Sequence, residues 1–117
     1  MIRFPRSARL LSGSDFKRVF AAREARQNRL FRLHRAPLPA EAGAKGPRLG
    51  MAVSKRAARR AVDRNRIRRH IRESFRARSS RLAAYDYVVV ARSAAADADP
   101  ATLRGALDQL WLPLENE

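Results

Sequence analysis

The chain has 117 residues, and its 26 Lys and Arg side chains outnumber its 11 Asp and Glu side chains, which gives a net charge of +15. An excess of this size indicates a polyanionic partner. The absence of Cys excludes a disulfide framework, a Cys-type zinc site and a thiol nucleophile. No apolar run approaches the ~20 residues that cross a bilayer, and residues 1–6 contain no signal-like stretch, so we expect a cytoplasmic protein without membrane contact.

The positive charge is concentrated before residue 82. Residues 55–81 carry 12 basic and 2 acidic side chains, whereas residues 82–117 carry 2 basic and 6 acidic ones. We therefore expect the polyanion to contact the first two-thirds of the chain. Of the basic residues 23 are Arg and 3 are Lys, which suits phosphate binding and base stacking but is also what a GC-rich genome would produce.

Helical spacing of Phe16, Val19 and Phe20 predicts a first helix at about residues 13–23.

Two strands are predicted next. In residues 30–36, Phe31 and Leu33 alternate with Arg32 and His34, which indicates a strand with one apolar face. The alternation returns at residues 49–53. We expect these strands to pair as an antiparallel hairpin across a flexible, Pro-rich and Gly-rich loop at about residues 37–47.

A helix over residues 61–76 is the most informative element. Ile67, Ile71 and Phe75 share one sector of the helix, which should dock on the sheet. A second stripe of this helix carries polar and basic side chains, namely Asn65, Arg69, Arg72 and Arg76. Arg64 falls inside the apolar sector, so either the first turn is irregular or Arg64 has a structural role.

The stripe of Arg side chains favours phosphate binding over a merely solvated face. Like charges one turn apart repel one another, and only Glu73 offers relief within the helix. Just upstream, Lys55 and Arg56 lie where a strand leads into the helix, a natural position for an anion site, although an ordinary basic loop is the simpler alternative.

The apolar, β-branched run from Tyr87 to Ala91 predicts a central strand covered on both faces. A last helix should begin with Asp99 as N-cap and Pro100 at the first helical position, and end before Pro113. Asp97 and Asp99 are the only close acidic pair, and helix capping explains Asp99, so we assign no catalytic residue to the chain.

The sequence resembles the protein subunit family of bacterial ribonuclease P. The resemblance is carried by RLGMAVSKR at residues 48–56, by RNRIRR at residues 64–69, by FKRVF at residues 16–20 and by DYVVVAR at residues 86–92. It covers about residues 10–112, and the order of these segments makes it specific.

The resemblance implies a single domain over residues 1–117 with its core at about residues 10–112. The fold it implies is α+β, a two-layer sandwich in which a small mixed sheet packs with about three helices. The order of the elements predicted above, α-β-β-α-β-α, is compatible with this fold. It also implies a left-handed βαβ crossover, although nearly all such crossovers are right-handed.

The resemblance also implies a function. In this family the catalytic subunit is an RNA that uses Mg²⁺ to remove the 5′ leader of precursor tRNA, and the protein binds that RNA and the leader. We therefore expect no cofactor or metal on the protein alone. The expected partners are the RNase P RNA and the tRNA leader, with no DNA.

Site residues follow from the resemblance, position by position. Those expected to bind the RNA subunit are Lys55, Arg56, Arg60, Arg64, Asn65, Arg66, Arg68, Arg69 and Arg72, and the basic stripe of the helix adds Arg76. Those expected to bind the single-stranded leader are Phe16, Phe20, Phe31 and His34. Aromatic faces stack on unpaired bases of any sequence, but the three Phe side chains would serve equally as core. His34 stands where many family members have Tyr.

A ribosomal or general RNA-packing protein is the alternative that small size and positive charge fit equally well. Selectivity separates the two classes of protein, since only a ribonuclease P subunit should favour leader-bearing tRNA over mature tRNA. A self-sufficient nuclease would need gathered carboxylates, and a DNA-binding protein would be expected to carry a helix-turn-helix pattern.

Overall fold

The structure is a computed structural model that describes residues 13–39 and 46–117. The helices are α2 (Gly13–Ala21), α3 (Ala61–Arg78) and α4 (Pro100–Trp111). The strands are β1 (Ala25–Gln27), β2 (Phe31–Pro37), β3 (Arg48–Ala52) and β4 (Tyr85–Ala91). Short 3₁₀ helices are η1 (Ser79–Arg81), η2 (Ser93–Asp97) and η3 (Leu112–Leu114). The predicted α+β class, with a small mixed sheet and about three helices, is confirmed.

The four strands form one sheet in the order β1-β2-β4-β3. β2 runs antiparallel to both β1 and β4, whereas β3 and β4 are parallel. The predicted hairpin between β2 and β3 is therefore wrong. The most apolar strand, β4, lies between them because that position buries both of its faces.

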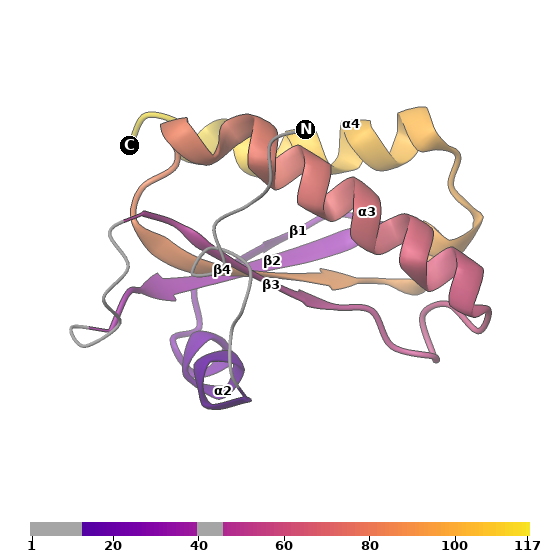
Figure 1. Cartoon of the computed structure of the whole chain (residues 1–117), viewed down its shortest axis with the longest axis horizontal. Helices are drawn as coiled ribbons and strands as arrows, with labels where there is room; N and C mark the ends of the chain where they lie inside the picture. The colour runs from indigo at the N-terminus through magenta and orange to yellow at the C-terminus, as the bar shows by residue number, and fades with distance from the viewer. Residues whose placement is uncertain (1–12, 40–45) are drawn as a thin grey trace.

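Helices lie on both sides of the sheet (Figure 1). α3 and α4 cover one face, and the short helix α2 lies against the other. The main core is between the sheet and the α3–α4 layer, where Phe31, Phe75, Tyr87 and Trp111 have no exposed surface. Under α2 a second, smaller buried cluster consists of Val19, Ala36 and Val88.

The middle helix has the predicted apolar face. Ile67, Ile71 and Phe75 are fully buried in α3, which removes some of the largest side chains of the helix from water. The helix extends two residues beyond its predicted end, to Arg78. Together β3, α3 and β4 form the βαβ unit that the resemblance implies, while the hand of this crossover stays a prediction.

The C-terminal helix begins as predicted. The carboxylate of Asp99 accepts a hydrogen bond from the Thr102 backbone N–H at 2.7 Å, and Pro100 follows it at the first helical position. None of the helices in the described ranges is both long and apolar enough to span a membrane.

Two parts of the prediction need correction or qualification. β1 was not predicted, because its three residues are all exposed and show no alternation. The predicted loop at 37–47 begins one residue too early, since Pro37 belongs to β2, and its middle, residues 40–45, lies outside the described residues.

Candidate nucleic-acid interface

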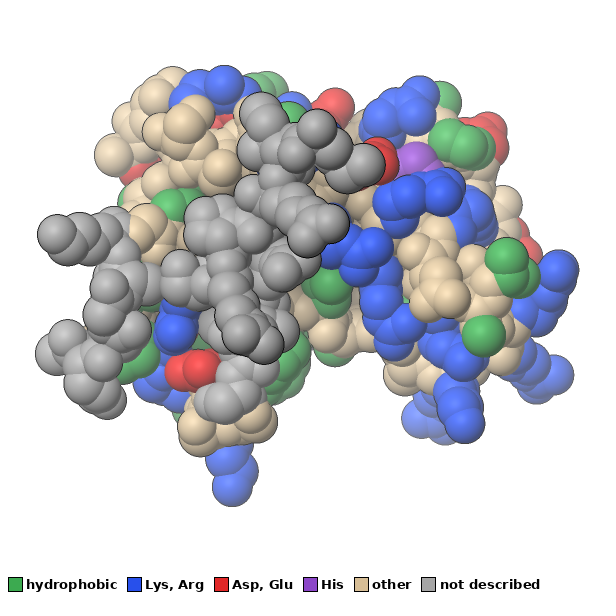
Figure 2. All heavy atoms as spheres, viewed as in Figure 1, with side chains coloured by type: hydrophobic (Ala, Val, Ile, Leu, Met, Phe, Trp, Pro, Cys, Tyr) green, Lys and Arg blue, Asp and Glu red, His purple; other side chains and the backbone are tan. Residues whose placement is uncertain are grey.

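Basic side chains gather over α3 and the segment that precedes it, at the right of Figure 2. We define the basic face by its exposed members, which are Lys55, Arg56, Arg60, Asn65, Arg69, Arg72 and Arg76. Among the described residues, neither Arg69 nor Arg72 has an ion-pair or hydrogen-bond partner. The packing of α3 explains the arrangement, because burial of Ile67, Ile71 and Phe75 turns the opposite side of the helix outward.

Three other predicted RNA-binding side chains are partly buried and bind within the chain. The Arg64 guanidinium donates to the carbonyl oxygens of Ala58 and Arg59, at 3.0 and 2.8 Å. Arg66 donates to the carbonyl oxygens of Ala98 and Ala96, at 2.9 and 3.0 Å. Of the two alternatives given for Arg64, these hydrogen bonds support the structural role, and Arg66 has a comparable role.

Arg68 is the third of these partly buried side chains. Its guanidinium donates to the Asn65 side chain at 3.3 Å and to the Val53 carbonyl oxygen at 3.5 Å. Arg68 therefore connects the first turns of α3 to the segment just after β3. The Asn65 side-chain oxygen accepts a hydrogen bond from Arg68.

A cavity of about 490 Å³ opens where the parallel strands β3 and β4 end. Three Arg side chains and two Ser side chains contribute to its wall, namely Arg29, Arg56, Arg92, Ser54 and Ser93. Arg29 and Arg92 were not among the predicted site residues. Parallel pairing of β3 and β4 would have placed the residues that follow both strands at one edge of the sheet. The predicted hairpin of β2 and β3 did not bring these residues together.

On the other face of the sheet, α2 and β2 bring three rings together. The ring centroids of Phe16 and Phe20 lie 6.3 Å apart, and Phe20 meets His34 edge to face at 4.7 Å. Phe20 is 41% exposed, whereas Phe16 is partly buried and His34 is 9% exposed. We call these three side chains the aromatic patch. Such rings offer stacking surface to unpaired bases.

Phe31 does not belong to the aromatic patch, which corrects its assignment to the leader site. It is fully buried in the main core on the face of the sheet that α3 and α4 cover. Successive side chains of a strand point to opposite faces, so Phe31 and His34 lie on different sides of β2. No ring surface of Phe31 is accessible to RNA.

The histidines have shifted acid–base properties. Burial lowers the pKa of His34 below its ordinary value, and the positive charge of Arg32 lowers it further. Burial also lowers the pKa of His70, to which Arg69, Arg104 and Arg66 add in the same direction while Glu73 opposes them. Both imidazoles are therefore neutral at pH 7, and neither adds charge to the basic face or to the aromatic patch.

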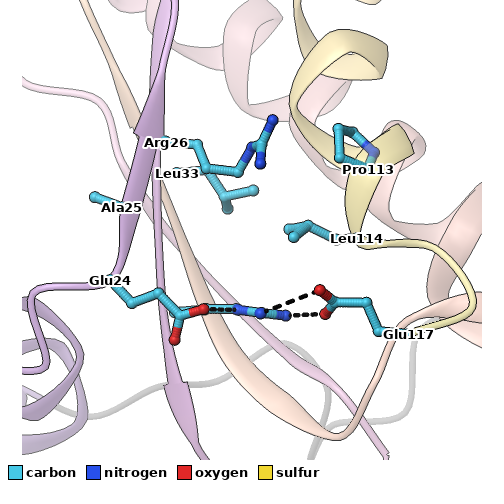
Figure 3. A pocket seen from close by; sticks show the side chains of 8 residues that line it. Glu24, Ala25, Arg26, Leu33, Pro113, Leu114 and Glu117 are labelled. Atoms are coloured by element: carbon cyan, nitrogen blue, oxygen red, sulfur yellow. Dashed lines mark hydrogen bonds and ion pairs between the residues drawn. The ribbon is translucent and has the colours of Figure 1, made fainter.

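A second cavity, of about 250 Å³, lies between β1, β2 and the C-terminal segment (Figure 3). Its Arg35 guanidinium is held by Glu24 at 2.6 Å and by Glu117 at 2.5 Å. Two carboxylates around one guanidinium leave this cavity without the excess positive charge of the basic face. It is therefore a poor candidate for binding phosphate.

The model of the family described as Ribonuclease P matches residues 4–115. The ribonuclease P protein component of Halorhodospira halophila is 49% identical over 110 residues, which cover 93% of this chain and 87% of the relative. That of Methylococcus capsulatus is 46% identical over 112 residues, with 95% and 84% covered.

Solved structures agree with this assignment. The RNase P protein of Staphylococcus aureus superposes with a TM-score of 0.81 at 30% identity, covering 91% of this chain and 94% of that one. The RNase P protein from Thermotoga maritima gives a TM-score of 0.72 at 27% identity, covering 92% and 94%. The architecture is thus that of bacterial RNase P proteins. The chain belongs to the ribonuclease P protein family.

Proposed function

We propose that the chain is the RNA-binding protein subunit of a ribonuclease P, and that it assists a catalytic RNA in removing the 5′ leader of precursor tRNA. The observation that carries this proposal is the basic face, where Arg69 and Arg72 project outward without an ion-pair partner among the described residues. The relatives named ribonuclease P protein component support it.

The basic face is proposed to bind the catalytic RNA. Each phosphate that an Arg or Lys side chain neutralises releases condensed counterions, so binding should weaken steeply with salt. Guanidinium groups also bind phosphate oxygens in a bidentate manner, which fixes orientation as well as adding affinity. Arg64 and Arg66 contribute to this face mainly by holding the backbone in place, because their guanidinium groups donate hydrogen bonds to carbonyl oxygens of the chain.

The aromatic patch is proposed to bind the single-stranded leader. Phe20 has the largest exposed ring surface of the three side chains, and Phe16 and His34 flank it. Stacking contributes about 1–3 kcal/mol per base and tolerates any base. A protein that serves many precursor tRNAs needs this tolerance, since their leaders differ in sequence.

In this proposal the catalytic RNA carries the Mg²⁺ ions and the cleavage chemistry, and the protein contributes charge and leader binding without a cofactor or a catalytic residue. The protein then increases the affinity for leader-bearing substrate and lowers the Mg²⁺ concentration at which the complex works. The cavity at the ends of β3 and β4, with Arg29, Arg56 and Arg92 in its wall, is proposed to bind RNA phosphates as well.

The test is reconstitution with the RNase P RNA from the same genome. Cleavage of precursor tRNA is followed at low and high Mg²⁺, with and without the chain, together with binding of precursor and mature tRNA. We expect the chain to restore cleavage at low Mg²⁺ and to favour the precursor. Equal binding of both tRNAs would indicate a general RNA-packing protein, and cleavage by the protein without RNA would contradict the assignment of catalysis to RNA.

A further inference from the structure

Helix α2, which carries two rings of the aromatic patch, has little apolar contact with the sheet. Among the residues that the structure describes, Val19 is its one buried side chain, and the cluster beneath it consists of Ala36 and Val88, with Phe16 and Val90 packed against it. Such small side chains remove little apolar surface from water. Within the described residues, the position of α2 therefore depends on polar contacts as well.

Those contacts are ionic. Asp86 on β4 has no exposed surface, and its carboxylate accepts two hydrogen bonds from Arg48 on β3, at 2.6 and 2.7 Å. Arg18 on α2 donates to the same carboxylate, and its second nitrogen donates to the Pro37 carbonyl oxygen at 2.7 Å. One buried anion thus ties the helix to two strands, and Arg18 reaches a third.

Asp15 closes the arrangement into a ring. Its carboxylate lies 3.4 Å from Arg18 and 3.4 Å from Arg48. We call Asp15, Arg18, Arg48 and Asp86 the ionic clamp. Charge-assisted hydrogen bonds of this kind are directional, and a network in which buried members satisfy one another fixes one geometry.

We infer that the ionic clamp sets the position of Phe16 and Phe20 over the sheet, which makes Asp86 a positioning residue for the leader site. This inference rests on the proposed function. Arg18 is two residues from both Phe16 and Phe20 in the helix, so a shift at Arg18 moves both rings relative to His34. Because Asp86 is fully buried, it acts on RNA only through the side chains it holds.

The sign of the effect separates positioning from simple electrostatics. Asp86→Asn preserves the shape of the side chain and raises the net charge of the protein by one. Electrostatics alone would then strengthen the binding of RNA. If the clamp positions the aromatic patch, the preference for leader-bearing tRNA must instead fall, by about tenfold, as expected for the loss of one stacked base.

The experiment measures the ratio of the Kd values for mature and precursor tRNA in the reconstituted complex. Asp108→Asn is the matched control. It also raises the net charge by one, but its carboxylate pairs with Arg78, 2.9 Å away, in the α3–α4 layer. We expect a normal ratio for Asp108→Asn, a reduced ratio for Asp86→Asn, and RNA-subunit binding no weaker than wild type in both. A folded Asp86→Asn protein with the wild-type ratio would overturn the inference.

Two further variants cover the remaining outcomes. Removing the buried charge of Asp86 could unfold the domain. If Asp86→Asn does not fold, the same ratio is measured for Asp15→Asn, which keeps the Asp86 carboxylate and should likewise show a reduced ratio. In addition, Asp86→Asn combined with Phe20→Ala should lose less discrimination than the sum of the two single losses, because Phe20 is already absent. Additive losses would contradict action through Phe20. A wild-type complex without any preference for precursor would defeat the proposed function instead.

Discussion

Phe20 on α2 and His34 on β2 meet edge to face, with their ring centroids 4.7 Å apart. The two residues come from elements that are separated in the chain by β1, and their contact makes one continuous surface of ring atoms. Phe20 supplies the exposed part of that surface, and the mostly buried His34 supports it. A base stacked on Phe20 would therefore rest on a ring that is held from below.

Phe20→Ala is expected to reduce the preference for leader-bearing tRNA while leaving RNA-subunit binding near the wild-type level. The reason is that the side chain is 41% exposed and belongs to α2, which lies on the opposite side of the sheet from α3 (Figure 1). The loss should correspond to about 1–3 kcal/mol, the contribution of one stacked base. Equilibrium binding of precursor and mature tRNA to the reconstituted complex measures it.

Phe31→Ala is the matched control, since it removes the same ring from the main core. Its unfolding free energy should fall by about 3–5 kcal/mol, the usual cost of truncating a buried Phe. Urea unfolding distinguishes the two variants. A Phe20→Ala protein as destabilised as Phe31→Ala would place Phe20 in the core instead of the leader site.

Arg69→Ala and Arg72→Ala should each weaken binding to the RNase P RNA and reduce the slope of log K against log salt. One phosphate contact contributes about 0.7–0.9 to that slope. Both side chains are exposed members of the basic face. Titrations at several salt concentrations give the slopes, and Arg26→Ala, which removes an exposed Arg from β1, should leave the slope unchanged. Unchanged slopes in both α3 variants would mean that this side of α3 faces solvent.

Local patterns in the sequence were sufficient for most elements. The helical spacing of Ile67, Ile71 and Phe75 correctly predicted the buried side of α3, and Asp99 with Pro100 correctly marked the start of α4. These signals are local, since each depends on residues within a turn or two of one another. The same is true of the alternation that identified β2 and β3.

Strand pairing is not local, and there the prediction was wrong. β2 and β3 are neighbours in the chain, but β4 pairs with both, because a strand that is apolar on both faces is best buried at the centre of the sheet. The error at Phe31 has another cause. The alternation in β2 already separated Phe31 from His34, yet the resemblance to the family placed both in one site. The ionic clamp escaped prediction because it joins residues far apart in the chain.

Stability should fall as the pH drops below about 6.5, the ordinary pKa of His. Burial lowers the pKa of His70 in the folded protein, so the unfolded chain binds more protons in this range. His34 acts in the same direction. Urea unfolding between pH 7.5 and 5.5, above the range where most carboxylates titrate, measures the decline. It should be smaller in His70→Gln and smallest in the double variant with His34→Gln, and an unchanged decline in the double variant would contradict this assignment.

Arg64 and Arg69 lie on the same helix, but they should respond differently to substitution. The Arg64 guanidinium donates to the carbonyl oxygens of Ala58 and Arg59, and so holds the turn before α3 against the helix. Arg64→Met removes these hydrogen bonds and should cost about 1.5–3 kcal/mol of unfolding free energy, while the RNA affinity of the folded variant falls less than in Arg69→Ala. Urea unfolding and RNA titration at a temperature where both variants are folded provide the comparison. If the Arg64→Met protein kept the wild-type stability but lost RNA affinity, the Arg64 guanidinium of the wild-type protein would have to leave the two carbonyl oxygens and contact the RNA directly.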